Sequence, residues 1–171
     1  MSDSKKINIR QATLNDANTI LKEERAIAEI PGYFCSSPSE LSLDSIINAI
    51  SVLKDKSGVF LVAECNEVLV GHAFLEIPHV KSLQHVAELN MAVHLGWQNQ
   101  GIGTMLLHRI IDWAQESKFI RKIQLNVRAT NLPAISLYKK MGFEEEGRLK
   151  NRVRVNDSYV DDIIMGLSLV A

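Results

Sequence analysis

The sequence predicts a mixed α/β fold in one domain, residues 1–171, with seven strands and four helices. The chain has the length of one ordinary domain, and 46% of its residues are apolar. Runs that alternate apolar and polar residues, typical of strands, are interspersed with segments whose apolar residues recur every three or four positions, typical of helices. No repeat, linker or low-complexity segment indicates a second domain.

The first half of the chain predicts one strand, two helices and a hairpin. In order, these are a strand over Ile7–Arg10, a helix over Ala17–Glu29, a helix over Leu41–Leu53 and a hairpin over residues 59–78. Asn15 or Asp16 is the expected cap of the first helix, and Pro31 follows its end. The hairpin is expected to turn near Asn66, and Pro78 stops its second strand.

The second half continues with alternating strands and helices. The predicted elements are a strand over residues 85–93, a helix over residues 102–118, a strand over Lys122–Val127, a helix over residues 131–141, and strands over Glu144–Val155 and Tyr159–Leu169. Asn131 is the expected N-cap of the second of these helices, Pro133 lies in its first turn, and Gly142 follows its end. Strands joined through a helix are expected to pair in parallel.

Two glycines interrupt a polar stretch, "WQNQGIGTMLL", between a predicted strand and a predicted helix. A turn at a helix N-terminus exposes unpaired backbone N–H groups, with the positive end of the helix dipole behind them. Gly101 and Gly103 lack the Cβ atoms that would hold a phosphate away from residues 99–104. The stretch has neither the lysine of a P-loop nor the third glycine of a dinucleotide fingerprint, so it predicts a phosphate or pyrophosphate loop of another kind.

The same stretch resembles the acetyl-coenzyme A signature of the GNAT N-acetyltransferase superfamily, Q/R-x-x-G-x-G/A, with Gln98, Gly101 and Gly103 at its fixed places. The superfamily's second signature, N-x-x-A-x-x-L-Y-x-x-x-G-F, is matched at Asn131, Ala134, Leu137, Tyr138, Gly142 and Phe143. The nearest resemblance is to the small amino-acid and phosphinothricin-like acetyltransferases. One departure is visible, because the exit of the fourth strand, usually V-x-P, ends here in Leu95.

The resemblance implies a GNAT fold, whose central sheet is mostly antiparallel and splayed between strands four and five. It also implies acetyl-CoA as cosubstrate, with the pantetheine arm along the backbone of residues 91–93 and the pyrophosphate at residues 99–104. The residues implied to bind it are Met91, Ala92, Val93, Gln98, Asn99, Gln100, Gly101, Ile102, Gly103, Thr104, Asn131 and Tyr138.

The expected catalytic residues are Tyr138 and Glu88. By spacing alone Tyr138 is a helix tyrosine that packs its ring, but the resemblance gives it the role of general acid toward the coenzyme A thiolate. Alternation places Glu88 on one face of its strand with Asn90 and Ala92. A structural glutamate that faces solvent or pairs with an arginine is the alternative. By resemblance, we expect Glu88 to be the base or the anchor of a water relay.

The expected activity is acetyl transfer from acetyl-CoA to the primary amine of a small amino-acid-like molecule, by direct attack on the thioester. Ribosomal-protein-alanine acetyltransferases place a glutamate where this chain has Asn126, which ranks protein N-termini second. Polyamines and aminoglycosides rank third. A non-catalytic coenzyme A sensor is the non-enzymatic alternative, against which Tyr138 argues. Tyr33 and Phe34, in the loop after the first helix, either wall the acceptor site or anchor the loop.

Composition excludes several other partners. The net charge of −1 disfavours nucleic acid, and no apolar run approaches the length of a membrane span, so we expect a cytoplasmic protein. Cys35 and Cys65 are expected to be reduced thiols, and the five histidines show no metal-ligand spacing.

The charges of Arg25, Glu29, Arg148 and Arg152 could select an acceptor or only be solvated. The edge of the C-terminal strands is an expected contact of a homodimer.

Overall fold

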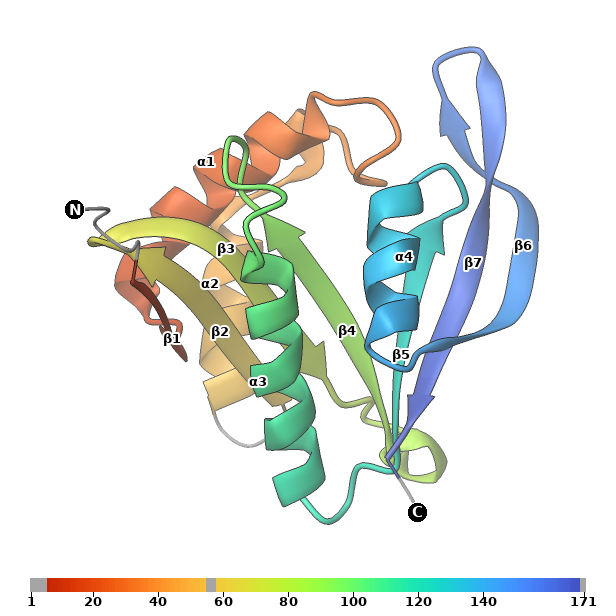
Figure 1. Ribbon diagram of the computed structural model, residues 1–171. Helices are drawn as coiled ribbons and strands as arrows, with labels where there is room; N and C mark the ends of the chain where they lie inside the picture. Colours follow the sequence, from red (N-terminus) through yellow and green to blue (C-terminus); the bar gives the residue numbers. More distant parts are fainter. Residues whose placement is uncertain (1–5, 55–57, 170–171) are drawn as a thin grey trace.

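The computed structural model describes residues 6–54 and 58–169, which form one seven-stranded sheet with helices on both faces (Figure 1). The strands are β1 (Ile7–Gln11), β2 (Gly58–Cys65), β3 (Val68–Glu76), β4 (Val86–Val93), β5 (Lys122–Arg128), β6 (Glu144–Val155) and β7 (Ser158–Ser168). The α-helices are α1 (Ala17–Ala28), α2 (Leu43–Val52), α3 (Ile102–Glu116) and α4 (Leu132–Lys140). This architecture confirms the predicted fold class.

The strand order is β1-β2-β3-β4-β5-β7-β6, and each described neighbouring pair is antiparallel except β4 with β5. Helix α3 links β4 to β5, which is the crossover that a parallel pair requires. The fully antiparallel β2–β3 hairpin turns at Asn66 and Glu67, whose φ angles of 48° and 66° suit a tight two-residue turn.

Two apolar clusters lie on opposite faces of the sheet. The larger cluster packs α3 and α4 against alternate residues of β2, β3, β4 and β5, with Leu106, Ile110 and Ile123 fully buried. The smaller cluster packs α1 and α2 on the other face, against Phe60 and Val62 of β2. Because successive side chains of a strand point to opposite faces, β2 and β3 contribute to both clusters, and most of their residues are buried.

The parallel pair β4–β5 is paired at one end only. Its register runs through Val86↔Lys122, Ala87↔Ile123 and Glu88↔Gln124 and then stops. Beyond this point β4 stays paired with β3 as far as Val93, and β5 stays paired with β7 as far as Arg128. The two strands therefore diverge toward their C-terminal ends (Figure 1), as the resemblance implied. Backbone N–H and C=O groups along the separated edges are left without a strand partner.

Some local details differ from the sequence-based prediction. The predicted caps of the first helix, Asn15 and Asp16, lie in a short 3₁₀ turn, where Asp16 Oδ2 accepts hydrogen bonds from the backbone N–H and the hydroxyl of Thr13. Asp16 also pairs with Arg10 at 2.8 Å, which lowers the pKa of this carboxyl. Asp16 thus lies at the predicted N-cap position of α1, but its side chain joins β1 to the turn before the helix and makes no capping hydrogen bond to α1. The second helix begins at Leu43, after the cap Ser42.

Strand β6 is the outer edge of the sheet, and nearly all of its residues are exposed or half-buried. The homodimer expected at this edge stays a prediction. No helix among the described residues is long and apolar enough to cross a membrane.

Candidate active site

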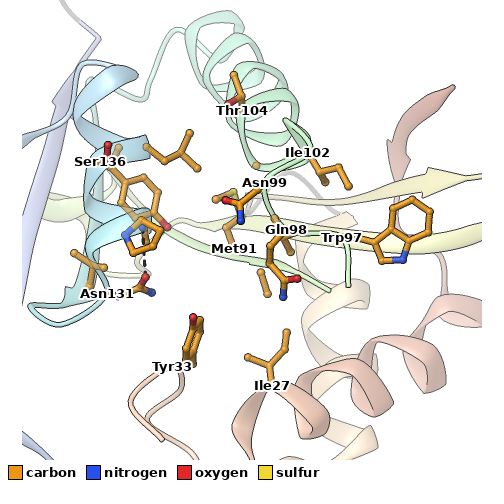
Figure 2. Close-up of a pocket in the computed structure, with 18 of the residues that line it drawn as sticks. Ile27, Tyr33, Met91, Trp97, Gln98, Asn99, Ile102, Thr104, Asn131 and Ser136 are labelled. Carbon is orange, nitrogen blue, oxygen red and sulfur yellow. Dashed lines mark hydrogen bonds between the residues drawn. The ribbon is translucent and has the colours of Figure 1, made fainter. Parts of the chain in front are cut away.

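A pocket of about 700 Å³ lies where β4 and β5 separate. The residues that line it come from α1 and the loop after it, the end of β4, the β4–α3 loop, the start of α3, the end of β5, and α4. Figure 2 shows Ile27 and Tyr33 on the opposite side of this pocket from Ile102 and Thr104. The pocket therefore passes between the two diverging strands and is reached from both layers of helices.

The loop before α3 turns through left-handed backbone conformations. Asn99 has φ 59° and Gly101 has φ 80°, and Gly101 occupies the N-cap position of α3. The N–H groups of the first helical turn, beginning at Ile102, have no acceptor within the helix and lie at the positive end of its dipole. The loop thus has the backbone geometry that an anion site needs, and its binding of a phosphate stays a prediction.

The two glycines of the signature meet different requirements. A Cβ atom on Gly101 would have no neighbour within 4 Å, so this glycine is needed for its positive φ. A Cβ atom on Gly103 would lie 2.9 Å from Leu137 Cδ2 of α4 and 3.6 Å from Met91 Cε. Gly103 therefore permits close contact between α3, α4 and β4, and it also lines the pocket.

Side-chain amides hold the loop in shape. Gln98 Oε1 accepts a hydrogen bond from the Gly96 N–H at 2.9 Å, and Gln100 Nε2 donates to the Gly96 carbonyl at 3.2 Å. Gln98 lines the pocket and Gln100 does not. Of the residues expected to bind acetyl-CoA, all except Gln100 line this one pocket. The fixed Gln98 of the signature therefore stabilises the turn that presents the helix N-terminus.

Tyr138 of α4 and Asn131, the N-cap before this helix, both line the pocket. Asn131 is the N-cap, and its Oδ1 accepts from the Ala134 N–H at 3.4 Å, which confirms the predicted cap. Tyr138 is 7% exposed, and its ring packs on Phe143 with the centroids 5.6 Å apart. Burial raises the pKa of Tyr138 to about 12. The hydroxyl is therefore protonated at neutral pH and is able to donate a proton.

Glu88 lies outside the pocket lining. It is exposed on β4 with Asn90, while Ala87 and Leu89 are buried, so the predicted alternation holds. Glu88 occupies the last position where β4 still pairs with β5. Ala92, which does line the pocket, lies four residues further along the strand, about 13 Å away. Glu88 therefore stands outside the described lining, and its role as the base or the anchor of a water relay stays a prediction.

Arg128 is a pocket residue that the sequence analysis missed. It is 8% exposed, donates through Nη1 to Asp162 Oδ1 and through Nη2 to Cys35 Sγ, and its Nε has no hydrogen-bond partner among the residues that the structure describes. By alternation Arg128 shares its face of β5 with Asn126, which also lines the pocket. Only the alternation of β5 could have signalled it, because the partners Asp162 and Cys35 are distant in sequence.

The other charged residues considered as selectors of an acceptor do not line the pocket. Arg25 donates to the Leu41 carbonyl at 2.8 Å, and Arg148 pairs with Asp161 at 2.6 Å. Tyr33 and Phe34 do line it, as an acceptor wall would. Among the described lining residues the charged side chains are Arg128 and Lys140, and none is acidic. The described part of the chain contains no group of three His, Cys, Asp or Glu side chains that could hold a metal ion.

Comparisons with known proteins agree with this geometry. The profile of the Acetyltransferase (GNAT) family matches residues 21–143. The chain is 32% identical to the L-amino acid N-acetyltransferase AaaT of Escherichia coli K12 over 114 residues, 66% of this chain and 70% of that protein. It is 33% identical to an N-alpha-acetyltransferase of Sulfolobus acidocaldarius over 162 residues, 87% of this chain and 88% of that protein.

A solved structure shares the fold as well. The chain aligns with yncA, a putative acetyltransferase from Salmonella typhimurium solved with its cofactor acetyl-CoA, at a TM-score of 0.88 and 21% identity, over 96% of this chain and 94% of that one. The family profile spans the segment from α1 to the end of α4 and so includes the phosphate loop and Tyr138. The chain therefore belongs to the GNAT acetyltransferase family and is an N-acetyltransferase.

Proposed function

We propose that the chain is a single catalytic domain that transfers an acetyl group from acetyl-CoA to the primary amine of a small amino-acid-like acceptor. The observation that carries this proposal is the pocket between β4 and β5, which joins the loop before α3 to a wall that holds Arg128, with no acidic side chain among the described lining residues. An acceptor that carries a carboxylate matches such a wall, whereas a polycation does not.

The residues present fit acetyl-CoA. The Cβ-free positions Gly101 and Gly103 and the first N–H groups of α3 suit a pyrophosphate. The free edge of β4 at residues 91–93 suits the amide-bearing pantetheine arm, which hydrogen-bonds as an added strand would. Acetyl-CoA supplies an activated acyl group whose leaving thiolate must gain a proton.

Tyr138 is the proposed source of that proton. Tyr138 lines the pocket and, with a pKa raised to about 12 by burial, its hydroxyl stays protonated at neutral pH. The incoming ammonium must lose a proton before it attacks. Glu88 is proposed to anchor the water chain that removes it, because it lies on the same face of β4 as Ala92, at the closed end of the opening.

The hydrogen-bond partners of Arg128 indicate the class of acceptor. Arg128 forms an ion pair with Asp162 through Nη1, finds no partner for Nε among the described residues and uses a weak acceptor, the Cys35 thiol, for Nη2. A carboxylate is a stronger acceptor for a guanidinium than a thiol is. We therefore propose Arg128 as the group that faces the acceptor carboxylate. The likeness to AaaT, which is named for L-amino acids, supports the same class.

Acetylation of a protein N-terminus is the second candidate. The N-alpha-acetyltransferase of Sulfolobus acidocaldarius matches a larger share of this chain than AaaT does. Against it stands Asn126, which lines the pocket where the resemblance leads one to expect a glutamate, because an amide does not take up the proton of an ammonium group. A coenzyme A sensor without catalysis is the third candidate.

A panel of acceptors, read by thiol release from acetyl-CoA, separates these candidates. The panel holds the common L-amino acids, their amides, peptides with free N-termini, spermidine and an aminoglycoside. We expect the highest kcat/KM for a free L-amino acid and a lower value for its amide, which lacks the carboxylate. Faster acetylation of a peptide would favour the second candidate, and tight acetyl-CoA binding without any turnover would favour the sensor.

A further inference from the structure

A chain of hydrogen bonds crosses the interior between α1 and the end of β4. Glu24 Oε1 lies 3.0 Å from His72 Nε2, and His72 Nδ1 lies 3.0 Å from His94 Nε2. At the far end, His94 Nδ1 lies 3.0 Å from the Leu69 carbonyl oxygen. His72 and His94 are 2% and 1% exposed, and neither lines the pocket. The proposed reaction therefore leaves these buried groups without a role.

The groups at the two ends of this row of hydrogen bonds determine how many hydrogen-bonding protons it contains. The Leu69 carbonyl only accepts, so His94 Nδ1 must carry a proton. The bond between the rings needs a second proton, and the bond between His72 and Glu24 needs a third. Two neutral imidazoles carry two ring protons between them. The third proton makes either His72 a cation beside an ionised Glu24 or Glu24 a neutral acid, and in both cases the three side chains together carry no net charge.

The surroundings agree with this count. Burial, with the charge of His72 as a smaller cause, lowers the pKa of His94 to about 4, so the second ring is neutral at neutral pH. The ring of Phe60 stacks on His72 from β2 at a centroid distance of 6.0 Å and brings no charge. An unpaired buried charge would be costly, whereas a unit of zero net charge with every bond satisfied is not.

The chain joins the two walls of the pocket. Ile27, one helical turn after Glu24, lines the pocket from α1, and the loop that follows carries Tyr33. On the other side, His94 directly follows Val93, and the His94 carbonyl accepts from the Trp97 N–H at 3.1 Å.

We propose that Glu24, His72 and His94 are positioning residues. They hold the part of the pocket lined by Ile27 of α1 and Tyr33 of the following loop, here called the acceptor wall, at a fixed distance from the end of β4 that is proposed to bind the cosubstrate. The three side chains share three hydrogen-bonding protons and together carry no net charge. Since α1 contributes few other contacts to β3, loss of the Glu24 bond is expected to release the wall and leave the phosphate loop intact.

Nuclear magnetic resonance of ¹⁵N-histidine-labelled protein tests the proton count directly. In the parent at neutral pH we expect three exchange-protected ring N–H protons if His72 is the cation, or two ring protons and a protonated Glu24 carboxyl if Glu24 is the neutral acid, with the ring protons assigned by single substitution of each histidine with asparagine. Glu24→Gln should show two, because the new amide N–H donates to His72 Nε2 and both rings then stay neutral. Only two protected ring protons together with an ionised Glu24, read from the ¹³C chemical shift of its carboxyl group, would overturn the count.

Steady-state kinetics tests the positioning role. With the L-amino acid that the acceptor panel selects, Glu24→Ala should raise the acceptor KM by about tenfold or more, because misplacement of a substrate wall is costly. Acetyl-CoA affinity by calorimetry should stay within about twofold, since Glu24 does not contact the phosphate loop. Glu24→Gln should restore most of the KM. Glu23→Ala, on the same helix, is the matched control, because no hydrogen bond or ion pair of Glu23 is found among the described residues.

A Glu24→Ala variant that lost thermal stability but kept the parent KM would overturn the positioning role. If Glu24→Ala does not fold, Glu24→Asp, which is one methylene shorter, takes its place with the same expected change in KM. The kinetic measurement rests on the proposed function, whereas the proton count does not. Absence of turnover with every acceptor would therefore count against the proposed function. The ring-proton spectrum would still test the proton count of the hydrogen bonds among Glu24, His72 and His94.

Discussion

Replacing Tyr138 with phenylalanine removes one hydroxyl group from the pocket and leaves the ring in place. The ring is 7% exposed and packs on Phe143, so these contacts remain in the variant. The hydroxyl makes no hydrogen bond to another described residue, and removing a polar group without a protein partner is nearly neutral for stability. We expect the free energy of unfolding to change by less than about 1 kcal/mol.

The effect on the reaction should be much larger. Because burial raises the pKa of Tyr138 to about 12, the parent carries the proton throughout the neutral range. Loss of a positioned general acid typically lowers kcat by on the order of 10²-fold, which corresponds to about 2.7 kcal/mol of transition-state stabilisation. Acetyl-CoA affinity should change by no more than a few fold, since the proton is needed only once the thiolate departs.

Thiol release gives kcat, calorimetry gives the acetyl-CoA dissociation constant, and thermal unfolding shows that the variant is folded. Tyr159→Phe is the matched control, because Tyr159 is 62% exposed on β7 and does not line the pocket. A Tyr138→Phe enzyme with the kcat of the parent would refute the acid role. Rate would then come from cosubstrate positioning and from desolvation of the amine.

Three further predictions test the loop, the water relay and the buried histidine. Gly103→Val should abolish the stabilisation of about 2.7 kcal/mol that acetyl-CoA gives at 100 times its dissociation constant. The substitution should also lower the free energy of unfolding of the protein without ligand by about 1–3 kcal/mol, because the new side chain meets Leu137. Thermal unfolding measures both effects. Glu88→Gln should lower kcat/KM most near neutral pH and recover at high pH, where the amine arrives neutral, as a pH–rate profile will report. The lowered pKa of His94 gives stability that is present above pH 6.5 and lost as the pH falls to about 4, by up to about 3 kcal/mol in denaturant titrations.

Each of these predictions has a result that contradicts it. Unchanged acetyl-CoA stabilisation in Gly103→Val would mean that the loop does not bind the cosubstrate. An equal loss of rate at every pH in Glu88→Gln would exclude a proton-removing role. The acid-induced loss assigned to His94 should be missing from His94→Asn, and an identical pH dependence in that variant would show that other groups are responsible.

Local features of the sequence determined the elements and their ends. Gly101, with φ 80°, and Asn131, which caps α4, were predicted from their neighbours alone, because a turn or a cap is specified within a few residues. Asp16 lies at the predicted N-cap position of α1, but its side chain binds Arg10 and Thr13 and makes no capping hydrogen bond to the helix. Nearly all of the residues expected to bind acetyl-CoA line one pocket. The two signatures include them because these short motifs cover the loop and the helix ends that surround the pocket.

Tertiary structure decided which side chains share the acceptor wall and which stand apart from it. Arg128 lies in the pocket and is held by Asp162, 34 positions away in the chain, while Glu88 lies outside it. His72 is joined to His94 across 22 positions and to Glu24 across 48. Periodicity gives the face on which a residue lies, but such contacts depend on strand register, on where β4 and β5 separate, and on how α1 packs over the sheet. Those are set by the packing of the whole chain and are not written in any short stretch of it.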